Sequence, residues 1–227
     1  MNNQADTIDL NRDKTLTSSL NRTMYFFIKR LFDVLMAIIG IIAMIPIALI
    51  VKVSYMLTGD FDSIFYKQKR IGKNGEEFDF YKFRSMIPNA DEVLKELLKN
   101  DKKLAKEYKI NKKLEHDPRV TKMGNILRKT SLDELPQVLN IIKNDMSVIG
   151  NRPYLPREKE DMGIYYNDII KTKPGLTGLW QVSGRNELSF QEMVALDLYY
   201  INNLNWLLDL KIIMKTIGVV FLPKGAF

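Results

Sequence analysis

The stretch VLMAIIGIIAMIPIALIV, residues 34–51, decides the fold of this chain. It holds 18 residues without a charge, seven of them Ile, which is near the shortest length at which a helix crosses a bilayer. It begins too far from the start of the chain for a cleaved signal peptide, so we interpret it as a retained membrane element. Pro46 interrupts the run, and a proline inside a helix breaks or kinks it.

Basic residues lie on both sides of this run, where a single span should show a basic excess on one side only. The flanking cations are Arg22, Lys29 and Arg30 before it and Lys52, Lys67, Lys69, Arg70 and Lys73 after it. They predict a re-entrant helix-break-helix over residues 23–57 that enters one leaflet, breaks at Pro46 and returns. A tilted single span and a buried helix of a soluble core are the two alternatives.

The flanking regions differ in character. Residues 1–22 are rich in Asn, Asp, Thr and Ser and predict a flexible tail. Residues 58–227 are long enough to form one domain with its own core. Within that domain, residues 63–70 and 77–84 are rich in Phe and Tyr and are separated by Gly72-Lys73-Asn74-Gly75, which predicts a β-hairpin.

Three further segments have helical patterns. Residues 91–115 predict one charged helix with a single apolar stripe. Residues 189–203 and 206–221 predict two more helices, and the last suits either the membrane interface or a soluble core. The sequence therefore predicts an α+β, mainly helical fold with a re-entrant membrane helix-break-helix, a small β-hairpin and amphipathic interfacial helices.

Composition restricts the chemistry. The chain has no cysteine and one histidine, His116, which excludes thiolate nucleophiles, Cys-ligated metal sites and a histidine-rich metal site. The net charge of +7 indicates an anionic partner, such as anionic lipid, nucleic acid or a phosphorylated substrate. Any covalent intermediate must then form on a carboxylate, a hydroxyl or a lysine.

The adjacent carboxylates Asp133 and Glu134 come shortly after Arg128 and Lys129 in the sequence. A carboxylate beside such cations suits a phosphate-bearing substrate, which makes Asp133 the first candidate nucleophile. Ser131-Leu132-Asp133-Glu134 also matches a capping box, with Ser131 as the N-cap of a helix. The two interpretations are compatible, because the positive end of a helix dipole favours an ionised carboxylate.

Arginine-bearing loops surround this pair in the sequence. They are Asp117-Pro118-Arg119, Gly150-Asn151-Arg152-Pro153 and Ser183-Gly184-Arg185-Asn186. Arginine binds phosphate through two parallel hydrogen bonds, although each short motif taken alone is also typical of an ordinary surface loop.

Taken in order, these segments resemble the monotopic phosphoglycosyl transferases, a family of bacterial sugar transferases, from about Lys29 to Phe227. The matching segments are Lys29-Arg30-Leu31-Phe32-Asp33, Gln68-Lys69-Arg70-Ile71-Gly72, Tyr81-Lys82-Phe83-Arg84-Ser85-Met86, Asp117-Pro118-Arg119-Val120-Thr121, residues 127–137, Asp145-Met146-Ser147-Val148-Ile149-Gly150, Lys173-Pro174-Gly175-Leu176-Thr177-Gly178 and Gln181-Val182-Ser183-Gly184-Arg185.

The resemblance implies a reaction in two steps. Asp133 would attack the β-phosphate of a UDP-sugar, release UMP and carry the phosphosugar, which polyprenol phosphate (undecaprenyl phosphate) then accepts. Mg²⁺ would be the cofactor, with Asp133 as its contact, and Glu134 would orient the metal or assist proton transfer. The matched segments imply substrate-binding roles for Arg128, Arg152, Arg185, Lys82, Arg84 and Arg119.

The resemblance also implies a location and partners. Residues 58–227 would form a cytoplasmic catalytic domain with interfacial helices, held at the cytoplasmic face of the bacterial inner membrane. Its partners would be the UDP-sugar, polyprenol phosphate and membrane lipid, without nucleic acid, and a homo-oligomer is one option. The family usually has Gly-Pro-Arg-Pro where this chain has Gly150-Asn151-Arg152-Pro153, which removes one restraint on the loop that carries Arg152. The rival hypothesis is a noncatalytic, membrane-anchored basic scaffold that binds anionic lipid or nucleic acid.

Overall fold

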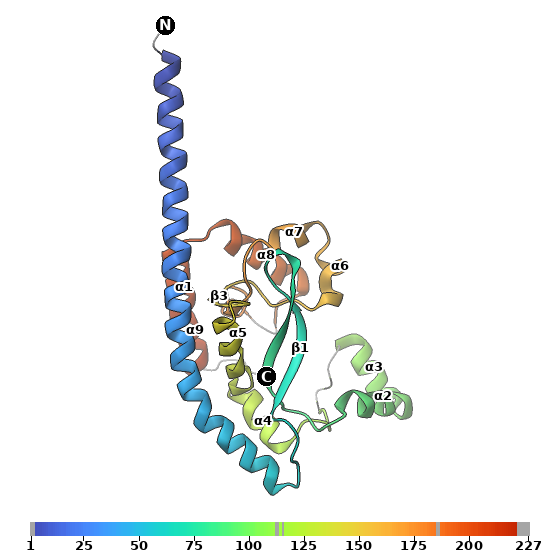
Figure 1. The fold of residues 1–227 in the computed structure, drawn as a ribbon. Helices are drawn as coiled ribbons and strands as arrows, with labels where there is room; N and C mark the ends of the chain where they lie inside the picture. Colours follow the sequence, from blue (N-terminus) through green and yellow to red (C-terminus); the bar gives the residue numbers. More distant parts are fainter. Residues whose placement is uncertain (1–2, 112–113, 115, 185–186, 222–227) are drawn as a thin grey trace.

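The computed structural model describes residues 3–111, 114, 116–184 and 187–221, and for residues 3–20, 109–111 and 219–221 it describes the backbone only. A long N-terminal helix, α1 (Asn3–Leu57), runs along one side of a globular domain that holds all the other elements (Figure 1). The C-terminal helix α9 (Trp206–Phe221) lies beside α1 (Figure 1). The fold is mainly helical, as the sequence predicted.

Helix α1 differs from the sequence prediction at both ends. Residues 3–22, predicted as a flexible tail, are helical and continuous with the apolar run. The predicted break at Pro46 is also absent, because the backbone stays helical through this residue. Proline removes only one intrahelical hydrogen bond, and the clash of its ring is relieved by bending. Figure 1 shows such a bend in the C-terminal half of α1.

One face of α1 is buried against the domain and the opposite face is exposed. Ala37, Met44, Val51 and Tyr55, spaced seven, seven and four residues apart, pack into a core with side chains of the hairpin and of α5 (Val138–Ile142). Gly40 permits the close approach of α1 to α5, since a Cβ there would lie 2.6 Å from Val138 Cγ1. The exposed face carries Leu31, Leu35, Ile38, Ile42, Ile45 and Leu49.

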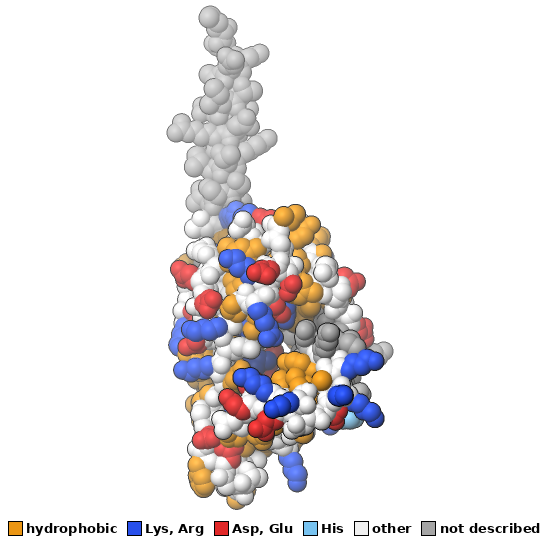
Figure 2. Space-filling model, turned by 90° about the vertical axis from the view of Figure 1, so that its right-hand side faces the viewer, with side chains coloured by type: hydrophobic (Ala, Val, Ile, Leu, Met, Phe, Trp, Pro, Cys, Tyr) orange, Lys and Arg blue, Asp and Glu red, His pale blue; other side chains and the backbone are white. Residues whose placement is uncertain are grey.

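The face of the molecule turned away from α1 carries charged side chains of both signs, with Lys and Arg mixed among Asp and Glu (Figure 2).

Residues 21–57 of α1 are long and apolar enough to cross a membrane, and their most apolar 18-residue window has a mean hydropathy of 3.0. Only 17% of that window is buried in the protein, so its apolar surface is mostly available to lipid.

Near its middle, α1 is held by a buried polar cluster. Lys29 Nζ forms an ion pair of 2.8 Å with Asp209 Oδ2 of α9 and donates to Tyr200 Oη of α8 (Phe190–Asn202) at 3.2 Å. Tyr25 Oη and Tyr200 Oη donate to the two Asp209 oxygens at 2.7 and 2.8 Å. The two partners of the Lys29 ammonium come from α8 and α9, so this cluster joins α1 to both helices.

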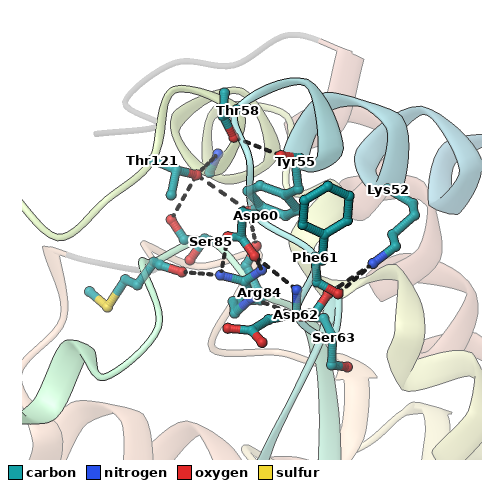
Figure 3. Close-up of polar contacts among 12 residues, drawn as sticks. Lys52, Tyr55, Thr58, Asp60, Phe61, Asp62, Ser63, Arg84, Ser85 and Thr121 are labelled. Carbon is teal, nitrogen blue, oxygen red and sulfur yellow. Dashed lines mark hydrogen bonds and ion pairs between the residues drawn. The ribbon is translucent and has the colours of Figure 1, made fainter.

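A second set of contacts holds the C-terminal end of α1 (Figure 3). The Arg84 guanidinium donates to both Asp60 carboxylate oxygens, at 2.8 and 2.9 Å, and to the Ser63 carbonyl. Tyr55 Oη donates to the Arg84 carbonyl, and the guanidinium carbon lies 4.6 Å from the Tyr55 ring centre. Lys52 of α1 donates to the carbonyls of residues 61 and 62. Together with the contacts of Arg84, these bonds fix the turn that follows α1 to the hairpin.

The predicted β-hairpin is confirmed. Strands β1 (Phe65–Ile71) and β2 (Glu77–Phe83) pair antiparallel around a short 3₁₀ turn, η1 (Lys73–Gly75). A second sheet was not predicted: β3 (Ser147–Ile149) pairs in parallel with β4 (Gly175–Thr177). Three-residue strands carry too little alternation to be read from sequence.

The remaining helices are short, apart from those near the C-terminus. The predicted single helix over residues 91–115 is two helices, α2 (Ala90–Asn100) and α3 (Lys102–Asn111), because Asp101 ends the first and its carboxylate caps the second by accepting from the Lys103 and Leu104 amides. Helices α8 and α9 confirm the two C-terminal predictions. The connecting helices are α4 (Lys122–Lys129), η3 (Pro156–Glu158), α6 (Lys159–Met162), η4 (Gly163–Tyr165) and α7 (Tyr166–Ile169).

The predicted capping box at Ser131 is wrong. Residues Leu132–Gln137 form a 3₁₀ helix, η2, and Ser131 before it has a left-handed backbone with φ +56° and no side-chain capping bond. An N-cap needs an extended backbone to aim its hydroxyl at the helix amides. The box geometry occurs instead at Ser189, whose hydroxyl accepts from the Glu192 amide while Glu192 Oε2 accepts from the Ser189 amide.

Alanine substitution distinguishes these two serines. Because Ser131 caps nothing, Ser131→Ala should change the free energy of unfolding by less than about 0.5 kcal/mol, whereas Ser189→Ala should lower it by about 1 kcal/mol. Urea unfolding of the two variants beside the parent measures this difference. A loss at Ser131 as large as that at Ser189 would contradict the geometry described here.

Candidate active site

A cavity of about 740 Å³ lies beside the hairpin. Its walls come from β1 and β2, from the segment after β2 up to the first turn of α2, from η2, and from β4 and the loops that follow β3 and β4. The lining residues used below are Arg70, Lys82, Ser85, Arg128, Asp133, Glu134, Gln137, Arg152, Trp180 and Gln181. The fold therefore brings together five of the segments that carried the sequence motifs.

Lys82 joins the two predicted catalytic carboxylates. Its ammonium nitrogen lies 2.9 Å from Glu134 Oε1 and 3.5 Å from Asp133 Oδ2. Lys82 is on β2 and the carboxylates are on η2, so the contact between strand and 3₁₀ helix positions them. The Glu134 carboxylate, which a capping box would have turned back to Ser131, points to Lys82 instead.

Asp133 is the more buried of the two carboxylates, with 14% of its side chain exposed against 36% for Glu134. Burial raises the pKa of Asp133, and the Lys82 ammonium opposes this shift by favouring the charged form. The Glu134 charge raises the pKa further, and Arg128 lowers it. Asp133 is thus a poorly solvated carboxylate whose ionisation depends on nearby cations, an environment typical of reactive groups.

Three of the predicted arginines, Arg84, Arg128 and Arg152, line the cavity, and the last two have N–H groups left for a ligand. Arg128, at the end of α4, donates from Nε to Ser85 Oγ at 2.9 Å. Arg152 forms an ion pair of 3.1 Å with Glu158, and its guanidinium carbon lies 5.2 and 5.8 Å from the ring centres of Tyr154 and Trp180. Both keep further N–H groups for a bound anion, since a guanidinium has five.

Sequence reasoning missed several polar side chains of this cavity. Arg70 is buried, and its pKa is lowered to about 10 by that burial and by the nearby Arg152 charge. Of the buried side-chain polar atoms without a hydrogen-bond partner among the described residues, four of five line the cavity: Arg70 Nε, Gln137 Nε2, Trp180 Nε1 and Gln181 Oε1. An unsatisfied buried polar atom costs about 1–3 kcal/mol, so this clustering indicates a polar ligand.

The other predicted substrate-binding residues have different positions. Arg84 reaches the cavity wall, but its guanidinium is held by Asp60, Ser63 and the Met86 carbonyl. Arg119 is buried outside the cavity lining, where it pairs with Asp117 at 2.6 Å and donates to the Ala90 carbonyl. Both therefore contribute to the fold through the contacts described. Arg185 lies outside the described residues.

The described residues of the cavity supply few ligands for a magnesium ion. No group of three or more Asp, Glu, His or Cys side chains that could hold a metal occurs within the described ranges. Mg²⁺ is commonly held by one or two carboxylates together with substrate phosphates. Asp133 and Glu134 supply that number of carboxylates, so such an ion would depend on a phosphate-bearing substrate for its remaining ligands.

Comparison with known proteins identifies the class. The model of the family described as bacterial sugar transferase matches residues 24–223, and the chain belongs to this family. The prediction of a transferase, made from the order of the motifs, is confirmed. The cavity and the Asp133–Glu134–Lys82 cluster lie within the matched residues.

Individual relatives are similar over most of this chain. The exopolysaccharide production protein ExoY of Sinorhizobium fredii is 46% identical over 199 residues, which cover 88% of each protein. The undecaprenyl-phosphate galactose phosphotransferase of Salmonella typhimurium is 43% identical over 204 residues, which are 88% of this chain and 42% of that one. The UDP-glucose:undecaprenyl-phosphate glucose-1-phosphate transferase of Klebsiella pneumoniae is 36% identical over 211 residues, 88% of this chain and 41% of that one.

The loop that carries Arg152 depends on a buried carboxylate. Asp197 of α8 accepts hydrogen bonds from the Arg152 amide at 2.9 Å and from Tyr154 Oη at 2.8 Å. Burial raises the pKa of Asp197 to about 7, while the two hydrogen bonds and the Arg152 charge lower it. Asp197 is therefore a positioning residue for Arg152.

This pKa predicts how stability varies with pH. The pKa of Asp197 is higher in the folded chain than the unfolded value of about 3.9, so the folded chain holds this proton more tightly. The resulting contribution to the free energy of unfolding is complete below pH 4 and is lost as the pH rises towards 7. The loss is on the order of 4 kcal/mol, and Asp197→Asn should remove that part of the pH dependence of urea unfolding. The exposed variant Asp168→Asn should keep the parent profile. A parent profile that does not fall between pH 5 and pH 8 would contradict this account.

Proposed function

We propose that this chain transfers a sugar-1-phosphate from a UDP-sugar to undecaprenyl phosphate through an aspartyl intermediate, at the cytoplasmic face of the bacterial inner membrane. The observation that carries the proposal is the Asp133–Glu134 pair held by Lys82 in a cavity with Arg128 and Arg152. The printed names of two relatives, which include undecaprenyl-phosphate and a galactose or glucose phosphate group, support the substrate class.

In the first step, an Asp133 carboxylate oxygen bonds to the β-phosphorus of the UDP-sugar. The bond from this phosphorus to the bridging oxygen breaks, and the oxygen leaves with UMP. Arg128 and Arg152 suit the diphosphate charge, because their N–H groups face the same cavity as Asp133. Burial raises the pKa of Asp133, and the Lys82 ammonium opposes this by favouring the ionised carboxylate.

In the second step, a phosphate oxygen of the lipid bonds to the phosphorus carried by Asp133. The bond between phosphorus and the carboxylate breaks, Asp133 is restored, and the product is a polyprenyl-diphosphate sugar. A bound Mg²⁺ would neutralise phosphate charge in both steps. Gln137, Trp180 and Gln181 bring buried polar groups without partners among the described residues, which suit the polar uridine or sugar parts of the donor.

The contacts of α1 support the re-entrant topology. Lys29 and Tyr55 are 26 residues apart, which is about 39 Å along a helix and more than the hydrocarbon thickness of a bilayer. Both contact the same domain, one through Asp209 and the other through Arg84. A helix that spanned the bilayer would place these two contacts on opposite sides, whereas one that enters and leaves the same leaflet keeps both.

The rival function, a noncatalytic basic scaffold, receives no support from the site. A surface that attracts anionic lipid or nucleic acid needs only exposed cations. It does not require two adjacent carboxylates that contact one lysine. Nor does it require a cavity where several buried polar atoms lack partners among the described residues.

The nucleophile is tested by Asp133→Asn. Purified parent protein given UDP-sugars and Mg²⁺ without lipid acceptor should release UMP and gain the mass of a phosphosugar, and the variant should do neither. Because burial raises the pKa of Asp133, the charged carboxylate opposes folding at neutral pH, so the Asn variant should melt no lower than the parent. The surface control Asp161→Asn on α6 should keep full activity. UMP release by the Asn variant at the parent rate would refute the assignment.

The topology is tested with single cysteines, which the cysteine-free chain permits. Cysteines introduced at Asn11 and at Lys73 should both resist a membrane-impermeant maleimide in intact spheroplasts and both react after lysis. A cysteine in a periplasmic loop of a known membrane protein serves as the positive control. Reaction of Asn11→Cys alone in intact spheroplasts would establish a single span.

A further inference from the structure

A second cavity, of about 310 Å³, is lined by residues of α1, of β3 and of the loop that precedes β4. Its lining is strongly basic: the charged residues are Lys29, Arg30, Lys73, Lys171, Lys173 and Asp33. Nothing in the proposed transfer reaction uses this cavity, because none of these side chains lines the larger one.

Only part of this positive charge is balanced. Lys29 pairs with Asp209 and Lys171 with Asp168. The Asp33 carboxylate is occupied by the Ser147 hydroxyl at 3.0 Å and the Val148 amide at 2.8 Å. Within the described part of the chain, Arg30, Lys73 and Lys173 form no ion pair with a carboxylate.

The three cations also crowd one another. Burial lowers the pKa of Lys173, and the charges of Arg30 and Lys73 lower it further. Arg30 donates to the carbonyls of Ile141 and Ile142 at 2.7 and 3.1 Å, which fixes its guanidinium at the end of α5. A positive cavity with one fixed guanidinium and two lysines is suited to a phosphate group.

The cavity has a defined position relative to the apolar surface. Lys29 and Arg30 are the last cations before the uncharged run of residues 34–51, the place where a membrane helix meets the headgroups. Phe26 belongs to the lining, and Phe27, one helical turn before Arg30, is exposed. The exposed stripe of Leu31, Leu35, Ile38 and Ile42 begins at the same level of α1, on the face turned away from the domain.

We propose that this second cavity binds the phosphate headgroup of an anionic membrane phospholipid at the level where α1 enters the leaflet. Lys73 and Lys173 contact the phosphate, together with Arg30. The volume is at the low end for small-molecule sites, which suits a headgroup. The bound lipid fixes the depth of α1 in the leaflet. It supplies counter-charge to the domain at the side where α1 enters the membrane.

The experiment measures lipid binding by the full chain in neutral detergent, by native mass spectrometry with phosphatidylglycerol and with phosphatidylcholine. The parent should bind one phosphatidylglycerol more tightly than it binds phosphatidylcholine. Each lysine beside an anionic headgroup contributes roughly a factor of five, so Lys73→Gln with Lys173→Gln should bind phosphatidylglycerol about 30-fold more weakly. Lys73→Gln alone, at an exposed position, should weaken it about fivefold, which keeps the test independent of any folding defect at Lys173.

The matched control is Lys102→Gln with Lys103→Gln on α3, which removes the same charge on the side of the molecule away from α1 (Figure 1). This control should bind phosphatidylglycerol as the parent does. An equal loss in both double variants would overturn the proposal in favour of nonspecific attraction. Displacement of the lipid by an equal concentration of inorganic phosphate would overturn it in favour of a free-anion site. None of these lipid-binding measurements uses a sugar donor, so their result is independent of the test of the transferase proposal.

Discussion

The ion pair between Lys29 and Asp209 is the interaction on which the arrangement of α1 depends. It is buried, and two tyrosine hydroxyls complete the hydrogen bonding of the carboxylate. Removal of one partner from such a pair leaves an uncompensated buried charge, which typically costs 3–5 kcal/mol. The apolar packing of Ala37, Met44 and Val51 alone would allow α1 to slide along the domain, since similar side chains recur along the helix. The ion pair permits one register only.

That register links α1 to the Asp133 carboxylate through a short series of contacts. The end of α1 is fixed to Arg84, which follows the last residue of β2, and Lys82 lies two residues earlier on that strand. Lys82 in turn holds both carboxylates of η2. The position of Asp133 is therefore set relative to α1 through Tyr55, Arg84 and Lys82. Arg84, which the sequence suggested as a ligand for phosphate, contributes by this route.

Much of the fold could be predicted, because long periodic segments dominate it. The hairpin and helices α8 and α9 were recognised from alternation, turn residues and helical spacing. The misses have local causes: Asp101 divides one expected helix, Ser131 adopts a left-handed backbone, and the helix tolerates Pro46 by bending. Each reflects a single residue whose conformation is decided by tertiary contacts, which periodicity does not report.

The sequence indicated a candidate carboxylate for the site, but it did not indicate all of the side chains that line the cavity. Adjacent carboxylates after basic residues pointed to Asp133 from the sequence alone. Arg70, Gln137, Trp180 and Gln181 carried no comparable signal, because each has one buried polar atom without a partner among the described residues, and burial is a property of the folded chain. Arg119 shows the converse, since its Asp-Pro-Arg motif resembles a ligand loop but forms an internal ion pair.

The separation of α1 into one packed face and one exposed face has a practical consequence for protein engineering. Side chains such as Leu31, Leu35 and Ile42 contribute little to the core, while Ala37, Gly40 and Met44 determine the contact with α5 and the hairpin. Polar residues could replace the first set without disturbing the second. Such a redesign would give a water-soluble form of the domain, suitable for crystallisation and for inhibitor screening without detergent.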